Sequence, residues 1–196
     1  MKYLVIADSH GYGIASAMER LRKDVTVKTV TVGSTARHVW QQYLEERENL
    51  VAYGPDEVFV HMGHNDAVWH VRHNLKPKHP MEILSILLGY VRHLEEDFPG
   101  KRIWISNMFP RVDGPKMAGP DRVDYNLMVY QYGLMMRDVL STRGVRFVLN
   151  RSLWYCPSRG IAHGVYFRSD GLHLSAVGAE AVAEQWLKIT HPPLAL

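Results

Sequence analysis

The segment YLVIADSHG, residues 3–11, passes abruptly from a continuous apolar run to polar residues and a glycine. A short apolar run of this kind is typical of a strand buried on both faces, as in a parallel sheet. A helical pattern follows from about Ile14 to Lys23, so the chain opens with a strand, a turn and a helix. In an open α/β sheet, ligands bind beyond the carboxyl ends of the strands. Ser9 occupies that position here.

The same alternation continues along the chain. We expect further strands over residues 25–32, 57–62, 101–108 and 145–149, and helices over residues 35–50, 81–97, 123–142 and 175–189, the last capped by Ser175. Strands that alternate with helices form a parallel sheet that is covered on both faces. Two long loops, at residues 65–80 and 110–120, follow strands at one sheet edge, and we expect them to wall a site.

The composition indicates one globular domain over residues 1–196, with 46% hydrophobic and 22% charged residues. The net charge of +3 is mild and no dense Lys/Arg run occurs, so nucleic acid is not an expected partner. A single cysteine excludes an intrachain disulfide and suits a reducing compartment. We see no signal-peptide pattern, and the apolar stretch at 81–91 is too short to span a bilayer. These features predict an intracellular, cytoplasmic protein.

Several rival motifs are incomplete. GYGIAS after the first strand has Ser16 where the dinucleotide fingerprint needs its third glycine, and no acidic residue ends the second strand. The chain lacks a Walker A sequence and the G-x-S-x-G elbow of ordinary α/β-hydrolases. We therefore expect no nucleotide cofactor. Cys156 could be a nucleophile, but a small structural thiol beside Pro157 is the simpler interpretation.

The eleven histidines raise the question of a metal. His70 and His73 could share a helix face, with His64 and His79 nearby. However, there is no H-E-x-x-H motif, no carboxylate cluster and no cysteine pair. The sequence therefore favours a site without metal.

Four short blocks place chemically useful residues at predicted strand exits or near the C-terminal end. They are IADSHG, VTVGSTA, HMGHND and DGLHLSAVG, which contribute Ser9, Gly33, Asn65, Asp170 and His173. A serine hydroxyl becomes a nucleophile when a base such as His173 removes its proton, and Asp170 could fix the imidazole tautomer. The Ser9 N–H, the Gly33 N–H and the Asn65 amide could stabilise the oxyanion.

Each residue also has a simpler role when taken alone. Ser9 and Asp170 could cap helices, His173 could lie on the surface, Asn65 could stabilise a turn, and Gly33 could serve only the backbone. The occurrence of all four blocks in order favours a serine esterase.

This constellation resembles the SGNH hydrolases, also called GDSL esterases. The third block, Gly-x-Asn-Asp, is met by residues 63–66, and the last, Asp-x-x-His, by Asp170 and His173 with Gly178 following. Gly33 matches the second block. The first block departs from the family, because Ala7 stands where the family has glycine. The segments HMGHND, NMFPR and DGLHLSAVG also resemble the sequences of SGNH-type domains of invertebrate and retroelement-encoded proteins.

The resemblance implies a flavodoxin-like three-layer α/β/α sandwich around a mostly parallel five-stranded sheet. It also implies no metal, and hydrolysis of esters, thioesters or O-acetyl groups on a small-molecule or acylated substrate. His10 and His64 flank the proposed catalytic positions, so they are candidates for the substrate pocket. The alternative function is a catalytically silent binding or interaction module, of the kind that a retroelement-encoded protein could carry.

Overall fold

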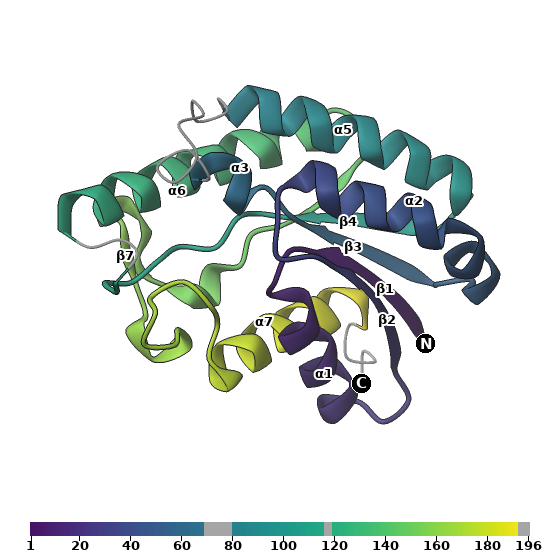
Figure 1. Cartoon of the computed structure of the whole chain (residues 1–196), viewed down its shortest axis with the longest axis horizontal. Coiled ribbons are helices and arrows are strands. Elements are labelled where there is room, and N and C mark those ends of the chain that lie inside the picture. The colour runs from purple at the N-terminus through teal and green to yellow at the C-terminus, as the bar shows by residue number, and fades with distance from the viewer. Residues whose placement is uncertain (69–79, 116–118, 192–196) are drawn as a thin grey trace, which may run out of the picture.

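The computed structural model describes residues 1–68, 80–115 and 119–191. Its centre is a five-stranded sheet with the order β2-β1-β3-β4-β5, in which every strand pairing is parallel (Figure 1). The strands are β1 (Lys2–Ala7), β2 (Thr26–Thr31), β3 (Glu57–His61), β4 (Arg102–Ser106) and β5 (Arg146–Val148). This strand order is that of flavodoxin-like folds, whose ligand site lies where the strand order reverses, between β1 and β3.

Helices cover both faces of the sheet (Figure 1). One face carries α1 (Gly11–Leu21) and α7 (Ala176–Thr190), which pack against each other. The other carries α2 (Ala36–Tyr53), α5 (Pro80–Asp97) and α6 (Gly119–Ser141). The expected three-layer sandwich is therefore confirmed, as is Ser175 as the cap of the last helix, because its side chain accepts a hydrogen bond from the Gly178 N–H.

Aromatic residues fill the core on the two faces of the sheet. Phe59 of β3 stacks on Trp186 of α7, with ring centroids 4.3 Å apart. Trp40 of α2 stacks on Tyr90 of α5 at 4.2 Å. Stacked pairs of this kind bury large apolar areas and hold the helices to fixed positions. The sheet edge that carries the polar blocks is therefore held on a rigid scaffold.

Several elements were not expected from the sequence. The segment predicted as a loop after β3 begins as the short helix α3 (His64–Val68). An antiparallel pair, β6 (Trp154–Cys156) and β7 (Ile161–Ala162), lies between β5 and α7. His70, His73 and His79 lie outside the described residues. No helix in the described part of the chain combines the length and apolar character needed to cross a membrane.

Candidate active site

Ser9 lies at the point where β1 gives way to α1. The apolar strand ends at Ala7, and the Gly11 N–H donates to the Asp8 carbonyl 3.0 Å away, which closes a tight turn before the helix. Ser9 is exposed at the top of this turn, whereas its neighbours Asp8 and His10 are buried. The turn therefore presents the Ser9 hydroxyl at the carboxyl edge of the sheet, as the sequence predicts.

Asp170 and His173 share one turn before α7. The Asp170 Oδ2 lies 2.6 Å from His173 Nδ1, and Asp170 Oδ1 accepts hydrogen bonds from the N–H groups of Leu172 and His173, both at 2.9 Å. Partial burial opposes ionisation of this carboxyl. The hydrogen bonds from the His173 ring and from the two backbone N–H groups outweigh it and hold the pKa of Asp170 well below its usual range. Asp170 is therefore a carboxylate at neutral pH.

The fold brings this turn against Ser9. His173 Nε2 lies 3.1 Å from Ser9 Oγ, although the two residues are 164 positions apart in the chain. The Asp170 carboxylate can only accept a hydrogen bond, so the neutral His173 ring carries its proton on Nδ1. This leaves Nε2 free to accept a hydrogen bond from the Ser9 hydroxyl. Ser9, His173 and Asp170 thus form a continuous chain of hydrogen bonds, each donated in the direction that removal of the Ser9 proton requires.

The loop after β4 supports the Asp170 turn. The Val112 N–H donates to the Gly171 carbonyl at 3.1 Å, and Gly171 has a φ of +69° that favours glycine. Gly114 packs so closely on the Asp170 carbonyl that a side chain there would collide with it. The described residues of the loop predicted at 110–120 therefore pack against the Asp170 turn and support it.

Gly33 and Asn65 lie on the other side of Ser9. A Cβ atom placed on Gly33 would lie 3.9 Å from the Ser9 Cβ, and Gly33 is exposed without a positive φ. Neither the Ser9 N–H nor the Gly33 N–H donates to a protein acceptor within the described ranges. The Asn65 side-chain amide donates to the Ser34 carbonyl at 2.8 Å, which engages one of its two N–H bonds. The backbone N–H groups of Ser9 and Gly33 are thus left without a protein acceptor in the described ranges, and the half-buried Asn65 amide is bonded to the second block.

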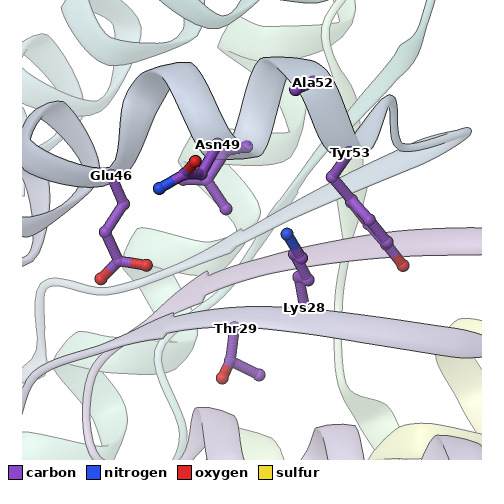
Figure 2. A pocket seen from close by; sticks show the side chains of 7 residues that line it. Lys28, Thr29, Glu46, Asn49, Ala52 and Tyr53 are labelled. Atoms are coloured by element: carbon purple, nitrogen blue, oxygen red, sulfur yellow. The ribbon is translucent and has the colours of Figure 1, made fainter.

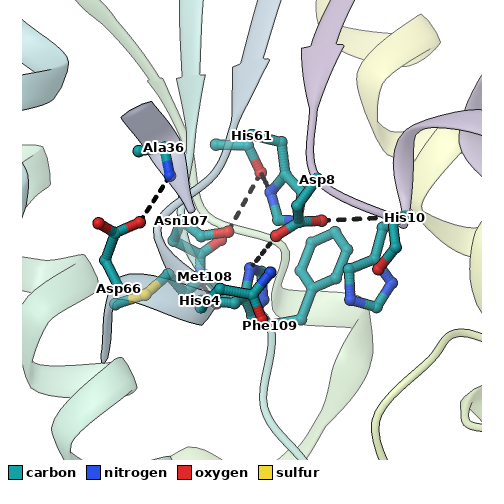
Figure 3. A network of polar contacts seen from close by, with 12 residues as sticks. Asp8, His10, Ala36, His61, His64, Asp66, Asn107, Met108 and Phe109 are labelled. Carbon is teal, nitrogen blue, oxygen red and sulfur yellow. Dashed lines mark hydrogen bonds and ion pairs between the residues drawn. The ribbon is translucent and has the colours of Figure 1, made fainter. Parts of the chain in front are cut away.

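The second and third blocks are joined at a further point. Asp66 Oδ2 accepts a hydrogen bond of 2.7 Å from the Ala36 N–H, the first residue of α2. A carboxylate at a helix N-terminus satisfies a free N–H and interacts favourably with the helix dipole. Asp66 therefore fixes the loop that carries Gly33 relative to the helix that carries Asn65 (Figure 3).

His64 lies beneath the site and not in a substrate pocket, contrary to the expectation from sequence. Its side chain is 3% exposed, its Nδ1 lies 2.8 Å from Asp8 Oδ2, and its Nε2 accepts the Phe109 N–H at 2.7 Å (Figure 3). Burial lowers the pKa of His64 to about 3, so the ring is neutral and its proton lies on Nδ1, facing Asp8. Asp8 and His64 thereby connect the exits of β1, β3 and β4.

A buried group of three potential metal ligands includes this pair. Oxygen or nitrogen atoms of Asp8, His61 and His64 lie within 4.8 Å of one another. A neutral imidazole has one lone pair, and that of His64 is already used by the Phe109 N–H. A metal at His64 Nδ1 would require either an imidazolate or the loss of this bond. The arrangement therefore suits a proton between His64 and Asp8 better than a metal ion.

His10 is buried beside the Ser9–His173 pair. Its ring centroid lies 5.6 Å from that of His173 and 5.2 Å from that of Phe109. Burial lowers the pKa of His10 well below its usual value, and burial likewise lowers the pKa of His61 to about 3. The histidines at positions 10, 61 and 64 are thus all neutral in the folded protein.

These three histidines predict a steep loss of stability in mild acid. In the unfolded chain they take up protons below about pH 6.5, whereas the folded protein keeps them neutral to a much lower pH. Above pH 6.5 these histidines do not reduce the free energy of unfolding, and this free energy falls as the pH is lowered from 6.5 toward about 3. Each proton contributes a slope of about 1.4 kcal/mol per pH unit, so three give about 4 kcal/mol per unit at full effect.

Urea unfolding at several pH values from 8 to 5 measures this slope. The His61→Gln variant removes one of the three protons and retains a polar atom for Ser106, whose Oγ lies 3.1 Å from His61 Nδ1. The slope of this variant should be about one third smaller, as one proton in three is lost. An unchanged slope would show that His61 is not neutral in the folded state.

Two pockets differ in their relation to Ser9. One of about 390 Å³ contains Ser9, His10 and His173 in its lining. The other, of about 480 Å³, lies over the edge strand β2 and helix α2, where Lys28 and Tyr53 face each other (Figure 2). Neither Ser9 nor His173 borders the second pocket. Of these two pockets, the one of about 390 Å³ borders Ser9, and His10 lies in its lining.

Sequence reasoning missed the polar network below the site. Asn150 donates to Ser106 Oγ at 2.7 Å and to Asn107 Oδ1 at 2.8 Å, and it accepts from Trp186 Nε1 at 3.0 Å. The His61 ring joins the network at Ser106. These residues come from β3, the ends of β4 and β5, and α7, so no short spacing in the sequence identifies them as a group. The sequence signal that could have found them is the polar residue at the end of each of these apolar strands.

Both the sequence and the fold are similar to those of known ester-hydrolysing proteins. The family described as GDSL-like Lipase/Acylhydrolase matches residues 8–186. No curated protein matches the sequence. Among solved structures, a GDSL-like lipase from Bacteroides thetaiotaomicron VPI-5482 is similar with a TM-score of 0.70 at 13% identity, covering 98% of this chain and 89% of that chain.

Two esterase structures are similar in the same way. The acetyl xylan esterase AlAXEase gives a TM-score of 0.68 at 15% identity, covering 96% of this chain and 99% of that chain. An acetyl-xylooligosaccharide esterase from Geobacillus Stearmophilus gives 0.67 at 19% identity, covering 100% and 96%. At these identities the likeness shows the fold, while the family match extends over nearly the whole chain. The protein therefore belongs to the GDSL-like lipase/acylhydrolase family and is an ester-hydrolysing enzyme with the SGNH hydrolase fold.

Proposed function

We propose that this enzyme cleaves carboxylic esters through an acyl-serine intermediate on Ser9. The observation that carries the proposal is the contact of 3.1 Å between Ser9 Oγ and His173 Nε2, combined with the 2.6 Å contact between His173 Nδ1 and Asp170. Ser9 is exposed at the mouth of a pocket, so a substrate carbonyl can approach it. Thioesters and O-acetyl groups are open to the same attack.

In the first half of the reaction, Ser9 Oγ forms a bond to the carbonyl carbon and its proton passes to His173 Nε2. The carboxylate of Asp170 stabilises the imidazolium that results. The carbonyl oxygen becomes an oxyanion, for which we propose the Ser9 N–H, the Gly33 N–H and the free N–H of Asn65 as donors. When the tetrahedral intermediate collapses, the bond to the alcohol breaks and His173 gives the alcohol its proton.

In the second half, water replaces the alcohol. His173 removes a proton from the water, hydroxide adds to the acyl-serine, and the acid leaves as Ser9 recovers its proton. The side chains present supply every proton transfer and every charge that these steps need. We therefore propose a reaction on a small acylated substrate in which no metal takes part.

We propose short acyl groups as substrates. The pocket of about 390 Å³ lies toward the small end of ligand sites, and it borders Ser9 directly. Two similar structures are esterases named for acetylated xylan or xylooligosaccharides. Hydrolysis of p-nitrophenyl acetate, butyrate and octanoate under matched conditions tests this part of the proposal. A rate that rises steadily with chain length would contradict it.

The role of Asn65 can be separated from a structural one. If its amide stabilises the oxyanion, the Asn65→Ala variant should lose about 100- to 1,000-fold in kcat with little change in KM, because the interaction forms in the transition state. Loss of the bond to Ser34 should cost only about 1 kcal/mol in the free energy of unfolding. Both kcat and Tm are measured on one preparation.

Asn49→Ala, an exposed position on α2, serves as the matched control and should keep both values. An Asn65→Ala protein with a clearly lower Tm and a nearly normal kcat would show that Asn65 serves only to hold the second block in place.

A further inference from the structure

The pocket beside Ser9 extends as a groove between α1 and the segment that leads into α7. Its lining includes Ser9, Gly13, Ser16, Arg20, Arg168 and His173. Small side chains form much of this lining, and a Cβ on Gly13 would already lie within 3.5 Å of the Ala179 Cβ. The groove is therefore narrow where the two helices meet, and it includes Ser9 and His173 among its walls.

The α1 side of the groove is one face of the helix. Gly13, Ser16 and Arg20 follow at steps of three and four residues, so they lie along one stripe. Arg20 lies seven residues beyond Gly13, which is about 10 Å along the axis at ~1.5 Å per residue. Cα–Cβ bonds in a helix tilt toward its N-terminus, so the Arg20 side chain starts in the direction of the end of α1 that carries Ser9.

The opposite side carries a second arginine that is held in place. The Arg168 N–H donates to the His173 carbonyl at 2.8 Å, and its side-chain Nε donates to the Leu174 carbonyl at 3.1 Å. The first bond holds the Arg168 backbone, and the second holds the Nε end of its guanidinium, next to the turn that carries His173. Among the described residues the terminal nitrogens have no carboxylate partner, and a guanidinium is well suited to binding a carboxylate.

The charge of the groove has one sign. Two arginines line it and no Asp or Glu does. Across the described residues, neither Arg20 nor Arg168 forms an ion pair with a carboxylate. The N-terminus of α7, at Ala176, adds the positive end of a helix of 15 residues. His10 is neutral in the folded protein, so the positive charge comes from the arginines and the helix end.

We propose that this groove binds a carboxylate carried by the substrate, at a distance of several bonds from the ester that Ser9 attacks. Arg20 and Arg168 would be specificity residues that hold the anionic end while the ester lies at Ser9. This inference rests on the proposed function, because the groove is useful for selection only if Ser9 is the nucleophile. Either the acyl part or the alcohol part of the ester could carry the anion, and the two cases give different substrates.

Two matched pairs of esters test the proposal. For an anionic acyl part, mono-p-nitrophenyl suberate is compared with p-nitrophenyl octanoate. For an anionic alcohol part, 8-acetoxyoctanoate is compared with octyl acetate. We expect kcat/KM to favour the anionic member of one pair by about tenfold, equivalent to ~1.4 kcal/mol. The preference should shrink in 1 M salt, where the screening length falls to about 3 Å.

The preference should fall to near unity in the double variant Arg20→Gln/Arg168→Gln. Arg92→Gln, on α5 across the sheet, removes an exposed arginine outside the groove and should keep the full preference. Equal rates on both members of both pairs, or a preference that survives in the double variant, would overturn this inference while Ser9 remains the nucleophile. Failure of the proposed function would look different, since octyl acetate, the neutral ester with the short acyl group, would not be hydrolysed.

Discussion

The Ser9→Ala variant should lose about a million-fold in kcat on short p-nitrophenyl esters, the effect of removing the nucleophile of a serine hydrolase. The loss is large because, among the described residues, Ser9 is the one whose hydroxyl contacts His173 Nε2. Stability should change by no more than about 0.5 kcal/mol, since Ser9 is exposed and its side chain bonds only His173. Steady-state kinetics and thermal unfolding of the same sample measure both quantities.

Covalent labelling gives an independent test of the same residue. A fluorophosphonate probe should modify the wild-type protein at Ser9, as found by mass spectrometry of the labelled peptide. Ser85→Ala, an exposed serine of α5, and Cys156→Ser should label as the wild type does. Labelling that persists in Ser9→Ala, at Cys156 or at another serine, would mean that the nucleophile lies elsewhere.

The second largest effect is expected for Asp170→Asn, at about 10,000-fold in kcat. An asparagine can still accept the N–H groups of Leu172 and His173 through its side-chain oxygen, so the turn should keep its shape. Its amide group would face His173 Nδ1 without a charge and would favour the wrong tautomer of the ring. The expected result is a folded protein with a nearly unchanged Tm and a very low kcat.

Asp138→Asn, an exposed acid of α6 paired with Arg137, provides the control for loss of one carboxylate. It should leave kcat unchanged. If Asp170→Asn retained more than about a tenth of the wild-type kcat, against the 10,000-fold loss seen for such triads, the carboxylate would be orienting nothing that the reaction needs.

Much of the fold could be predicted because its signals are local. The apolar runs at β1 and β3 and the alternation at β2 each mark a strand within a few residues. The boundaries moved by at most four residues, as in α1, which begins at Gly11 because the tight turn at Ser9 leads directly into the helix. Helix α3 was missed because its five residues are too few to show a periodic pattern.

The site was predictable in part for the same reason. Asp170 and His173 lie three residues apart, and Ser9 directly follows a strand, so short spacings identified them. The partners of His64 could not be found in this way. Its contacts join Asp8 at one strand exit to Phe109 at another, and adjacency in sequence to Asn65 suggested a pocket where the fold has a buried support. His64 and Asn65 are neighbours in α3, but successive side chains of a helix point about 100° apart around its axis, so adjacency in sequence does not place them on the same side.

The position of α7 has a consequence for how the protein is made. Trp186 stacks on Phe59 of β3, and Tyr3 of β1 shares a hydrogen bond of 2.7 Å with Thr190, yet α7 follows every strand of the sheet in the chain. During synthesis, β1 to β5 leave the ribosome first, with one face of the sheet still lacking this cover. That nascent face is apolar and prone to aggregation until α7 emerges and docks. The same docking brings His173 against Ser9, so the proposed catalytic contact forms only after nearly the whole chain has been synthesised.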